Sequence, residues 1–160
     1  MAGSTSKKVR VLRFQREAVH GFVQGGGFPS MSGVDLLTTE GVLVHMPYEE
    51  IKAVCFVQDF NDPPFRLDGA QFVSRPKSAG LWVRMKFRDG AQLDGLLSSQ
   101  LLQLDPFGFT IAPPDPGVNP QRVFVPRAAL ADIQVLAVVG SGLTQSRKKS
   151  AAESQQSKLF

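Results

Sequence analysis

The stretch from Val44 to Val57, VHMPYEEIKAVCFV, aligns without gaps on the stretch from Val123 to Leu136, VFVPRAALADIQVL. In each stretch an apolar strand ends at a proline, which has no backbone N–H to donate to a further strand bond. A single helical turn is expected next, over residues 48–52 in the first stretch and 127–131 in the second. Another apolar strand then follows. This order of elements, used twice, decides the fold that we predict.

A hairpin pattern precedes each of these stretches. Val9–Phe14 is followed seven residues later by Gly21–Val23, and Trp82–Phe87 is followed eight residues later by Gly95–Leu97. The second pair encloses Asp89-Gly90, and glycine tolerates the positive φ that a two-residue hairpin turn needs. Each unit therefore has the order strand, hairpin, strand, loop, strand, helical turn, strand. That order is typical of SH3-like and Sm-like small barrels.

We therefore expect an all-β fold of two tandem SH3-like or Sm-like small β-barrel units packed together. A unit of about 50 to 60 residues buries a low fraction of its surface, so we predict that the halves do not fold separately. Pairing of strands across the seam would remove one open edge from each unit. The expected boundaries are a disordered N-terminus (1–8), the first barrel (9–60), a linker (61–79), the second barrel (80–140) and a disordered basic tail (141–160).

The segment from Asp59 to Ala79 is rich in proline and polar residues, which is typical of a linker. It nevertheless holds three aromatic residues, Phe60, Phe65 and Phe72. One interpretation is that the three rings pack across the seam between the units. The other is that they are exposed and dock a partner, so they are our candidate partner-binding residues.

The charge of the chain lies mostly at its ends. The net charge of +4 suggests a nucleic-acid partner, but 12 basic and 13 acidic residues lie between residues 9 and 140, so the body carries about −1. The tail from Ser141 to Phe160 is rich in Ser, Gln, Lys and Ala and is expected to be disordered. Its basic residues Arg147, Lys148 and Lys149 are the candidate contacts if the protein binds nucleic acid.

Composition excludes several classes of protein. One Cys excludes a disulfide framework, and one Cys with two His is too few for a zinc site of three or four His/Cys ligands. The apolar runs are too short to cross a membrane. Met1–Lys8 lacks the apolar core of a secretory signal, so we expect a cytoplasmic protein. We predict no cofactor and no catalytic residue.

Three residues of reactive type receive structural interpretations. His20 and its counterpart Asp94 are both polar, so we expect this position to face solvent. His45 aligns with Phe124, so we expect a partly buried ring. Cys55 lies in an apolar strand, and we expect a buried and unreactive thiol, because reactivity needs an accessible, electropositive surround.

The segment Phe56-Val57-Gln58-Asp59-Phe60 resembles the one that closes the first half of a family of bacterial two-repeat proteins of unknown function. The second half of that family is similar to Phe87-Arg88-Asp89-Gly90 with Gly95, to Pro113-Pro114-Asp115-Pro116 and to Arg122-Val123-Phe124-Val125. The resemblance covers about residues 9–139. Family members often lie beside signalling domains, including domains that bind cyclic di-GMP, which implies a regulatory or adaptor role and no catalytic residue. Gly25-Gly26-Gly27 stands where the family has a more polar loop.

A more distant similarity is to Sm-like RNA-binding barrels. It rests on the spacing from Asp89-Gly90 to Gly95 and on the proline that ends the fourth strand of each unit. Sm-like proteins grip RNA with an Asp and Asn pair after the second strand and with an Arg-Gly at a later turn. Here Asp105 is followed by Phe107 and Phe109 without an Asn, and Arg127 is followed by Ala128. Most of the RNA-gripping residues are therefore absent.

Together these observations predict a non-enzymatic interaction, scaffolding or regulatory adaptor module. Its partners would be proteins, bound at the outer strand edges or at the aromatic linker. A homodimer through the sheet edges is a further possibility. The alternative is a protein that binds single-stranded nucleic acid or RNA through its small barrels and its basic tail; we consider this less favoured because the body is not basic.

Overall fold

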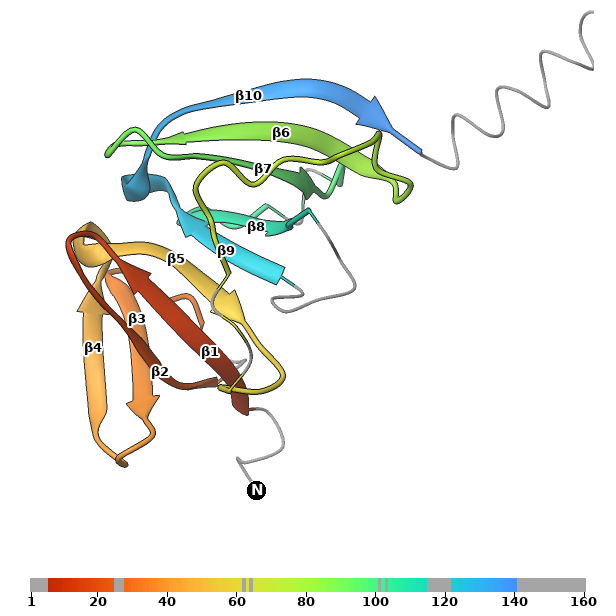
Figure 1. The fold of residues 1–160 in the computed structure, drawn as a ribbon. Coiled ribbons are helices and arrows are strands. Elements are labelled where there is room, and N and C mark those ends of the chain that lie inside the picture. The colour runs from red at the N-terminus through yellow and green to blue at the C-terminus, as the bar shows by residue number, and fades with distance from the viewer. Residues whose placement is uncertain are drawn as a thin grey trace, which may run out of the picture.

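The computed structural model describes residues 6–24, 28–61, 63, 65–100, 102, 104–114 and 122–140. Their secondary structure is almost entirely β (Figure 1). The first half holds β1 (Ser6–Arg13), β2 (Arg16–Gln24), β3 (Gly33–Thr38), β4 (Leu43–Pro47), the 3₁₀ helix η2 (Tyr48–Glu50) and β5 (Ile51–Phe56). The second half holds β6 (Gly80–Phe87), β7 (Gln92–Leu97), β8 (Gly108–Ala112), β9 (Arg122–Pro126), the 3₁₀ helix η4 (Arg127–Ala129) and β10 (Leu130–Val139). The all-β prediction is confirmed.

The strands do not form two closed barrels. They form one open ten-stranded sheet in the order β10-β6-β7-β8-β9-β5-β1-β2-β3-β4. The reason is that β5 uses both of its edges, one on β1 and the other on β9, so it has no edge left to close a barrel with β4. Pairing across the seam, which the sequence analysis predicted, therefore replaces barrel closure in the first half.

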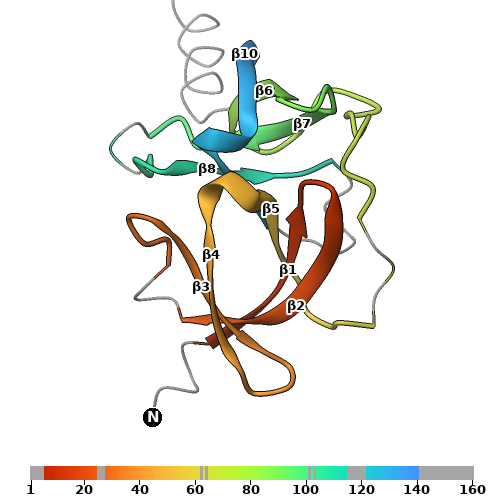
Figure 2. The same ribbon diagram turned by 90° about the vertical axis from the view of Figure 1, so that its left-hand side faces the viewer.

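The two halves have the same strand order within this sheet. The first half reads β5-β1-β2-β3-β4 and the second reads β10-β6-β7-β8-β9. The halves are joined where β5 pairs antiparallel with β9, with Val54 opposite Phe124, Cys55 opposite Val123 and Phe56 opposite Arg122. In Figures 1 and 2 this junction lies in the middle of the molecule, with the other strands of the first half below it and β6, β7 and β10 above it.

The local signals in the sequence produce the expected turns. Gly90 adopts φ 94° in the β6–β7 hairpin, where Asp89 Oδ1 accepts a bond from the Ala91 N–H at 3.1 Å. In the β1–β2 hairpin, Gln15 takes the positive φ, at 58°. Both proline-ended strands lead into a single 3₁₀ turn, shorter than the five-residue turns predicted. β1 begins at Ser6, so it includes Ser6–Lys8, which the sequence analysis had assigned to the N-terminal tail.

Two hydrophobic cores lie on either side of the junction, and the junction strands contribute to both. Ala53, Cys55 and Val57 pack in the core of the second half, whereas Ile51 and Val54 pack in the core of the first half. β9 divides in the same way: Val123 and Val125 join the second core and Phe124 joins the first. Successive side chains of a strand point to opposite faces, so pairing β5 with β9 places apolar residues in both cores at once.

The linker is attached to the second half along much of its described length. Leu67 is buried in the second core. The Gly69 N–H donates to the Gln92 carbonyl at 2.7 Å, and the Asp94 N–H donates to the Ala70 carbonyl at 2.9 Å. Figure 2 shows the linker running along one side of the molecule between the two halves.

Candidate functional site

The outer strands β4 and β10 each keep one edge without a pairing partner among the described strands. Exposed large apolar side chains lie on or beside both of them: Val135, Leu136 and Val138 on β10, Leu43 at the start of β4, and next to it Leu37 on β3 and Val42 in the β3–β4 turn. Unpaired backbone beside exposed apolar side chains is a template for the addition of another strand. These two edges are the first candidate binding surface.

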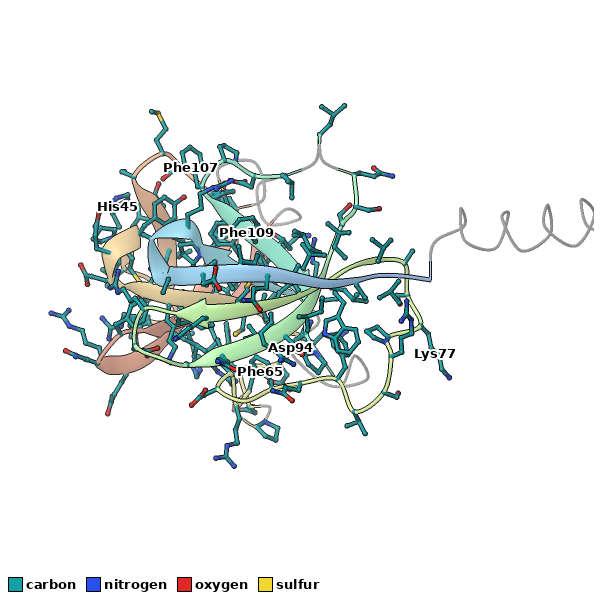
Figure 3. The ribbon with its side chains drawn as sticks, turned by 90° about the horizontal axis from the view of Figure 1, so that it is seen from above. His45, Phe65, Lys77, Asp94, Phe107 and Phe109 are labelled. Atoms are coloured by element: carbon teal, nitrogen blue, oxygen red, sulfur yellow. The ribbon has the colours of Figure 1, made fainter. Side chains whose placement is uncertain are left out.

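The environment of β4 differs from that of β9, the strand in the same position of the other half. Phe124 on β9 is 1% exposed and meets the Phe28 ring edge-on at 5.1 Å. His45, its counterpart on β4, is exposed, and its Nδ1 lies 2.7 Å from Asp35 Oδ1 (Figure 3). The expectation of a partly buried His45 is therefore wrong. Phe124 is buried because β5 and the first core cover it, whereas no described strand covers β4.

A similar difference separates β5 from β10. Cys55 on β5 is fully buried, as predicted, and this burial raises the pKa of its thiol to about 12, against a smaller opposing effect of the Arg10 guanidinium. Its counterpart on β10, Gln134, is exposed. Little thiolate forms at such a pKa near neutral pH, so the thiol is a poor nucleophile.

The position of His20 and Asp94 faces an arginine in both halves. Arg10 pairs with His20 across β1 and β2, and its Nε donates to His20 Nε2 at 2.9 Å. Arg84 pairs with Asp94 across β6 and β7, and its Nε lies 2.8 Å from Asp94 Oδ1. Burial, and then the Arg10 guanidinium, lower the pKa of His20 below its ordinary 6.5.

The prediction that this position faces solvent is wrong for Asp94, which is 1% exposed. Besides the bonds from Arg84, its carboxylate accepts a bond from Trp82 Nε1 at 3.1 Å, so the buried charge is well satisfied. These contacts indicate a structural role for the arginine-facing position in both halves. Neither pair opens into the pocket described below.

The three aromatic residues of the linker are partly buried. Phe60 stacks on His20 with 5.3 Å between ring centroids, and it also packs against the second core. Phe65 packs against that core as well, and Phe72 meets Trp82 edge-on at 5.8 Å. Phe60 therefore bridges the halves, as the seam-packing interpretation expects.

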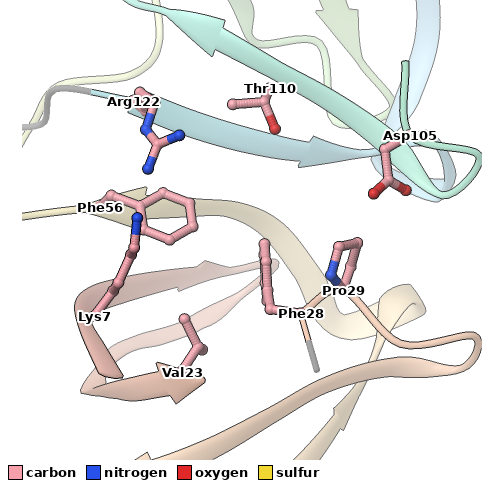
Figure 4. A pocket seen from close by; sticks show the side chains of 8 residues that line it. All are labelled: Lys7, Val23, Phe28, Pro29, Phe56, Asp105, Thr110 and Arg122. Atoms are coloured by element: carbon pink, nitrogen blue, oxygen red, sulfur yellow. The ribbon is translucent and has the colours of Figure 1, made fainter. Parts of the chain in front are cut away.

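A pocket of about 230 Å³ lies between the two halves, where β1, β5, β8 and β9 come together (Figure 4). Its lining residues are Lys7, Val23, Phe28, Pro29, Phe56, Asp105, Thr110 and Arg122. Lys7 and Arg122 lie at one end beside Phe56, and the Arg122 guanidinium sits 5.2 Å from that ring. Two cations beside an aromatic face suit an anionic or aromatic group. The sequence analysis missed this pocket because its residues come from distant segments without a shared motif.

The described residues contain no group of three or more His, Cys, Asp or Glu that could hold a metal ion. They also contain no helix with the length and hydropathy needed to cross a membrane. The sequence candidates Arg147, Lys148 and Lys149, and the glycine run Gly25–Gly27, lie outside the described residues.

Among known proteins, the chain matches one family model, but no curated protein and no solved structure matches it significantly. The model of a family of unknown function (DUF6982) matches residues 5–137, which agrees with the predicted membership of an uncharacterised family over nearly the whole body. The chain therefore belongs to the DUF6982 family, whose function is unknown.

Proposed function

We propose that this protein is a non-enzymatic interaction module that binds protein partners by strand addition at its outer edges. The observation that carries the proposal is the pair of edge strands, β4 and β10, each of which has one edge that no described strand pairs with, close to exposed apolar side chains. Main-chain bonds of an added strand would supply affinity, and the neighbouring side chains would supply specificity.

We also propose that the module arose by duplication of one SH3-like or Sm-like unit. The identical strand order of the halves supports this, and so do two equivalent close approaches. Gly33 lies opposite Pro47 and Gly108 lies opposite Pro126, each where a β-carbon would meet a backbone carbonyl oxygen within 2.4 Å. The resemblance to proteins found beside signalling domains extends the proposal to a regulatory adaptor.

The proposal is tested by affinity capture from cell extract, with and without nuclease. The bait proteins are the wild type, an edge variant carrying Leu43→Lys and Val135→Lys, and the control Val73→Lys, which changes an exposed apolar residue of the linker that is on neither edge strand. Partner proteins whose capture persists after nuclease treatment should bind to the wild type and to the control but not to the edge variant. The reason is that lysine on an edge opposes strand addition. Equal capture by all three would reject edge binding.

A second candidate is single-stranded nucleic acid, and the pocket between the halves favours it. Lys7 and Arg122 beside Phe56 and Phe28 combine cationic and aromatic contacts, as single-strand binding proteins do. Binding should then weaken steeply with salt, with Arg122→Ala and with deletion of residues 141–160, which contain Arg147, Lys148 and Lys149. A gel shift at low salt that detects no complex with the full chain rejects this candidate.

A further inference from the structure

We propose that copies of this chain join head to tail, with β10 of one molecule pairing antiparallel with β4 of the next. The contact would repeat the register that joins β5 to β9 inside each molecule. This inference rests on the proposed edge-binding function and names one partner for it, a second copy of the same chain.

Two edges of the sheet, one on β4 and one on β10, have no partner among the described strands. Inside the molecule, β5 of one half pairs with β9 of the other. β10 has the same place in its half as β5, and β4 has the same place as β9. One molecule therefore presents one open edge of each type, and these are the two types that already pair at the internal junction.

The internal register predicts which residues would face each other. Val54 opposite Phe124, Cys55 opposite Val123 and Phe56 opposite Arg122 define the internal junction. The equivalent pairs between two molecules are Ile133 with His45, Gln134 with Val44, and Val135 with Leu43. The last pair would bring together two apolar side chains that are 59% and 73% exposed in the single molecule. Directly opposed apolar side chains stabilise an antiparallel pair.

The outer edges also carry polar residues where the internal junction is apolar. Asp132 replaces Ala53, Gln134 replaces Cys55 and His45 replaces Phe124. Charged and polar residues on an edge weaken strand addition. The contact between molecules is therefore weaker than the internal one, and it is reversible.

The contact is heterologous, because two different edges meet. Repeating it gives a closed ring or an open chain of molecules, whereas a two-fold dimer would require β4 to pair with β4 or β10 with β10. This distinguishes the proposal from the homodimer considered in the sequence analysis, and it makes the pairing directly testable.

The first test is disulfide formation between two single variants, Leu43→Cys and Val135→Cys, at high concentration under mild oxidation. Residues opposite each other in an antiparallel pair have Cα atoms within disulfide range. The wild type is the control for Cys55, which is buried. A matched control mixes Leu43→Cys with Gln134→Cys, because neighbouring residues of a strand point to opposite faces. Circular dichroism first shows that each variant is folded.

The expected result is a cross-linked dimer in the mixture of Leu43→Cys with Val135→Cys, and little in either variant alone or in the matched control. A dimer from Leu43→Cys alone or Val135→Cys alone would show a symmetric contact and overturn the proposal. No dimer in the mixture would also overturn it. If the mixture forms no dimer but the lysine edge variant still loses its captured partner proteins, the edge-binding function stands and only the head-to-tail contact is rejected. Failure of the contact is therefore distinguishable from failure of the edge-binding function.

The second test strengthens the contact. The double variant His45→Phe and Asp132→Ala places the residues of the internal junction on the outer edges. Sedimentation should show assembly at a concentration at least about tenfold lower than for the wild type, which corresponds to ~1.4 kcal/mol of association free energy. Adding Val135→Lys should reverse the gain. An unchanged mass of the double variant would overturn the predicted register.

Discussion

β5 and β10 have the same place in the two halves, but their surroundings differ. β5 is paired on both edges and is largely buried, whereas β10 pairs with β6 alone among the described strands and is exposed along most of its length. The residue types follow this difference, because β5 carries Ala53 and Cys55 where β10 carries Asp132 and Gln134. A strand buried on both faces needs a nearly continuous apolar run, whereas a strand with an open face does not. Neighbouring strands, rather than position within the half, thus decide which residues are tolerated.

The largest expected effect comes from removing the second half. A chain of residues 1–62 loses β9 from the edge of β5, loses Phe124 from the first core and exposes Ala53, Cys55 and Val57. We predict that it shows no cooperative unfolding transition, in contrast to the full chain, because a unit of this size buries too little surface. Thermal and urea melts followed by circular dichroism provide the measurement. A sharp two-state melt of the fragment would mean that the junction is dispensable.

The next effect compares equivalent residues of β9 and β4. Phe124→Ala should lower the free energy of unfolding by about 3–5 kcal/mol, because it leaves a cavity in the first core. His45→Ala should change it by less than about 0.5 kcal/mol, because this side chain is exposed. Urea denaturation of both variants gives the difference. Similar losses for the two would contradict the distinction between a covered and an open strand.

The smallest expected effect is a pH dependence of the free energy of unfolding that comes from His20 in the first half. The pKa of His20 is below 6.5 in the folded protein, so as the pH falls through 6.5 the unfolded chain takes up the proton first. The free energy of unfolding should therefore fall between pH 6.5 and the lower folded value, and the stabilisation is complete above pH 6.5.

His20→Gln should remove this dependence while leaving an oxygen that can accept the bond from Arg10. The equivalent position of the second half holds Asp94 in place of a histidine. Urea denaturation from about pH 8 to about pH 5 compares the variant with the wild type. An equally steep fall in both proteins would assign the dependence to another group.

Local patterns in the sequence predicted the elements of the fold. Pro47 and Pro126 ended strands, and Asp89-Gly90 formed a hairpin turn, because these residues restrict the backbone within a few positions. The pairing across the seam was expected, but two closed barrels were wrong. Closure depends on which edge of β5 finds a partner, and this competition between distant strands has no local signal.

The alignment between the halves predicted the strand register of the aligned residues better than it predicted whether their side chains are buried. His45 and Phe124 lie at matching register positions of β4 and β9, and His20 and Asp94 both lie opposite an arginine on the neighbouring strand. The alignment failed for the burial of His45 because β4 lacks the cover that β9 has. It failed for Asp94 because an arginine on the neighbouring strand makes burial of a carboxylate tolerable.

The place of Cys55 has a practical consequence. The Sγ atom faces the second core from β5, so a thiol reagent reaches it only when the halves part or the whole chain unfolds. The labelling rate in native buffer therefore reports how often the halves part, and its response to denaturant separates that local opening from global unfolding. The chain thus contains an intrinsic chemical reporter of its own interior seam, and no probe has to be engineered.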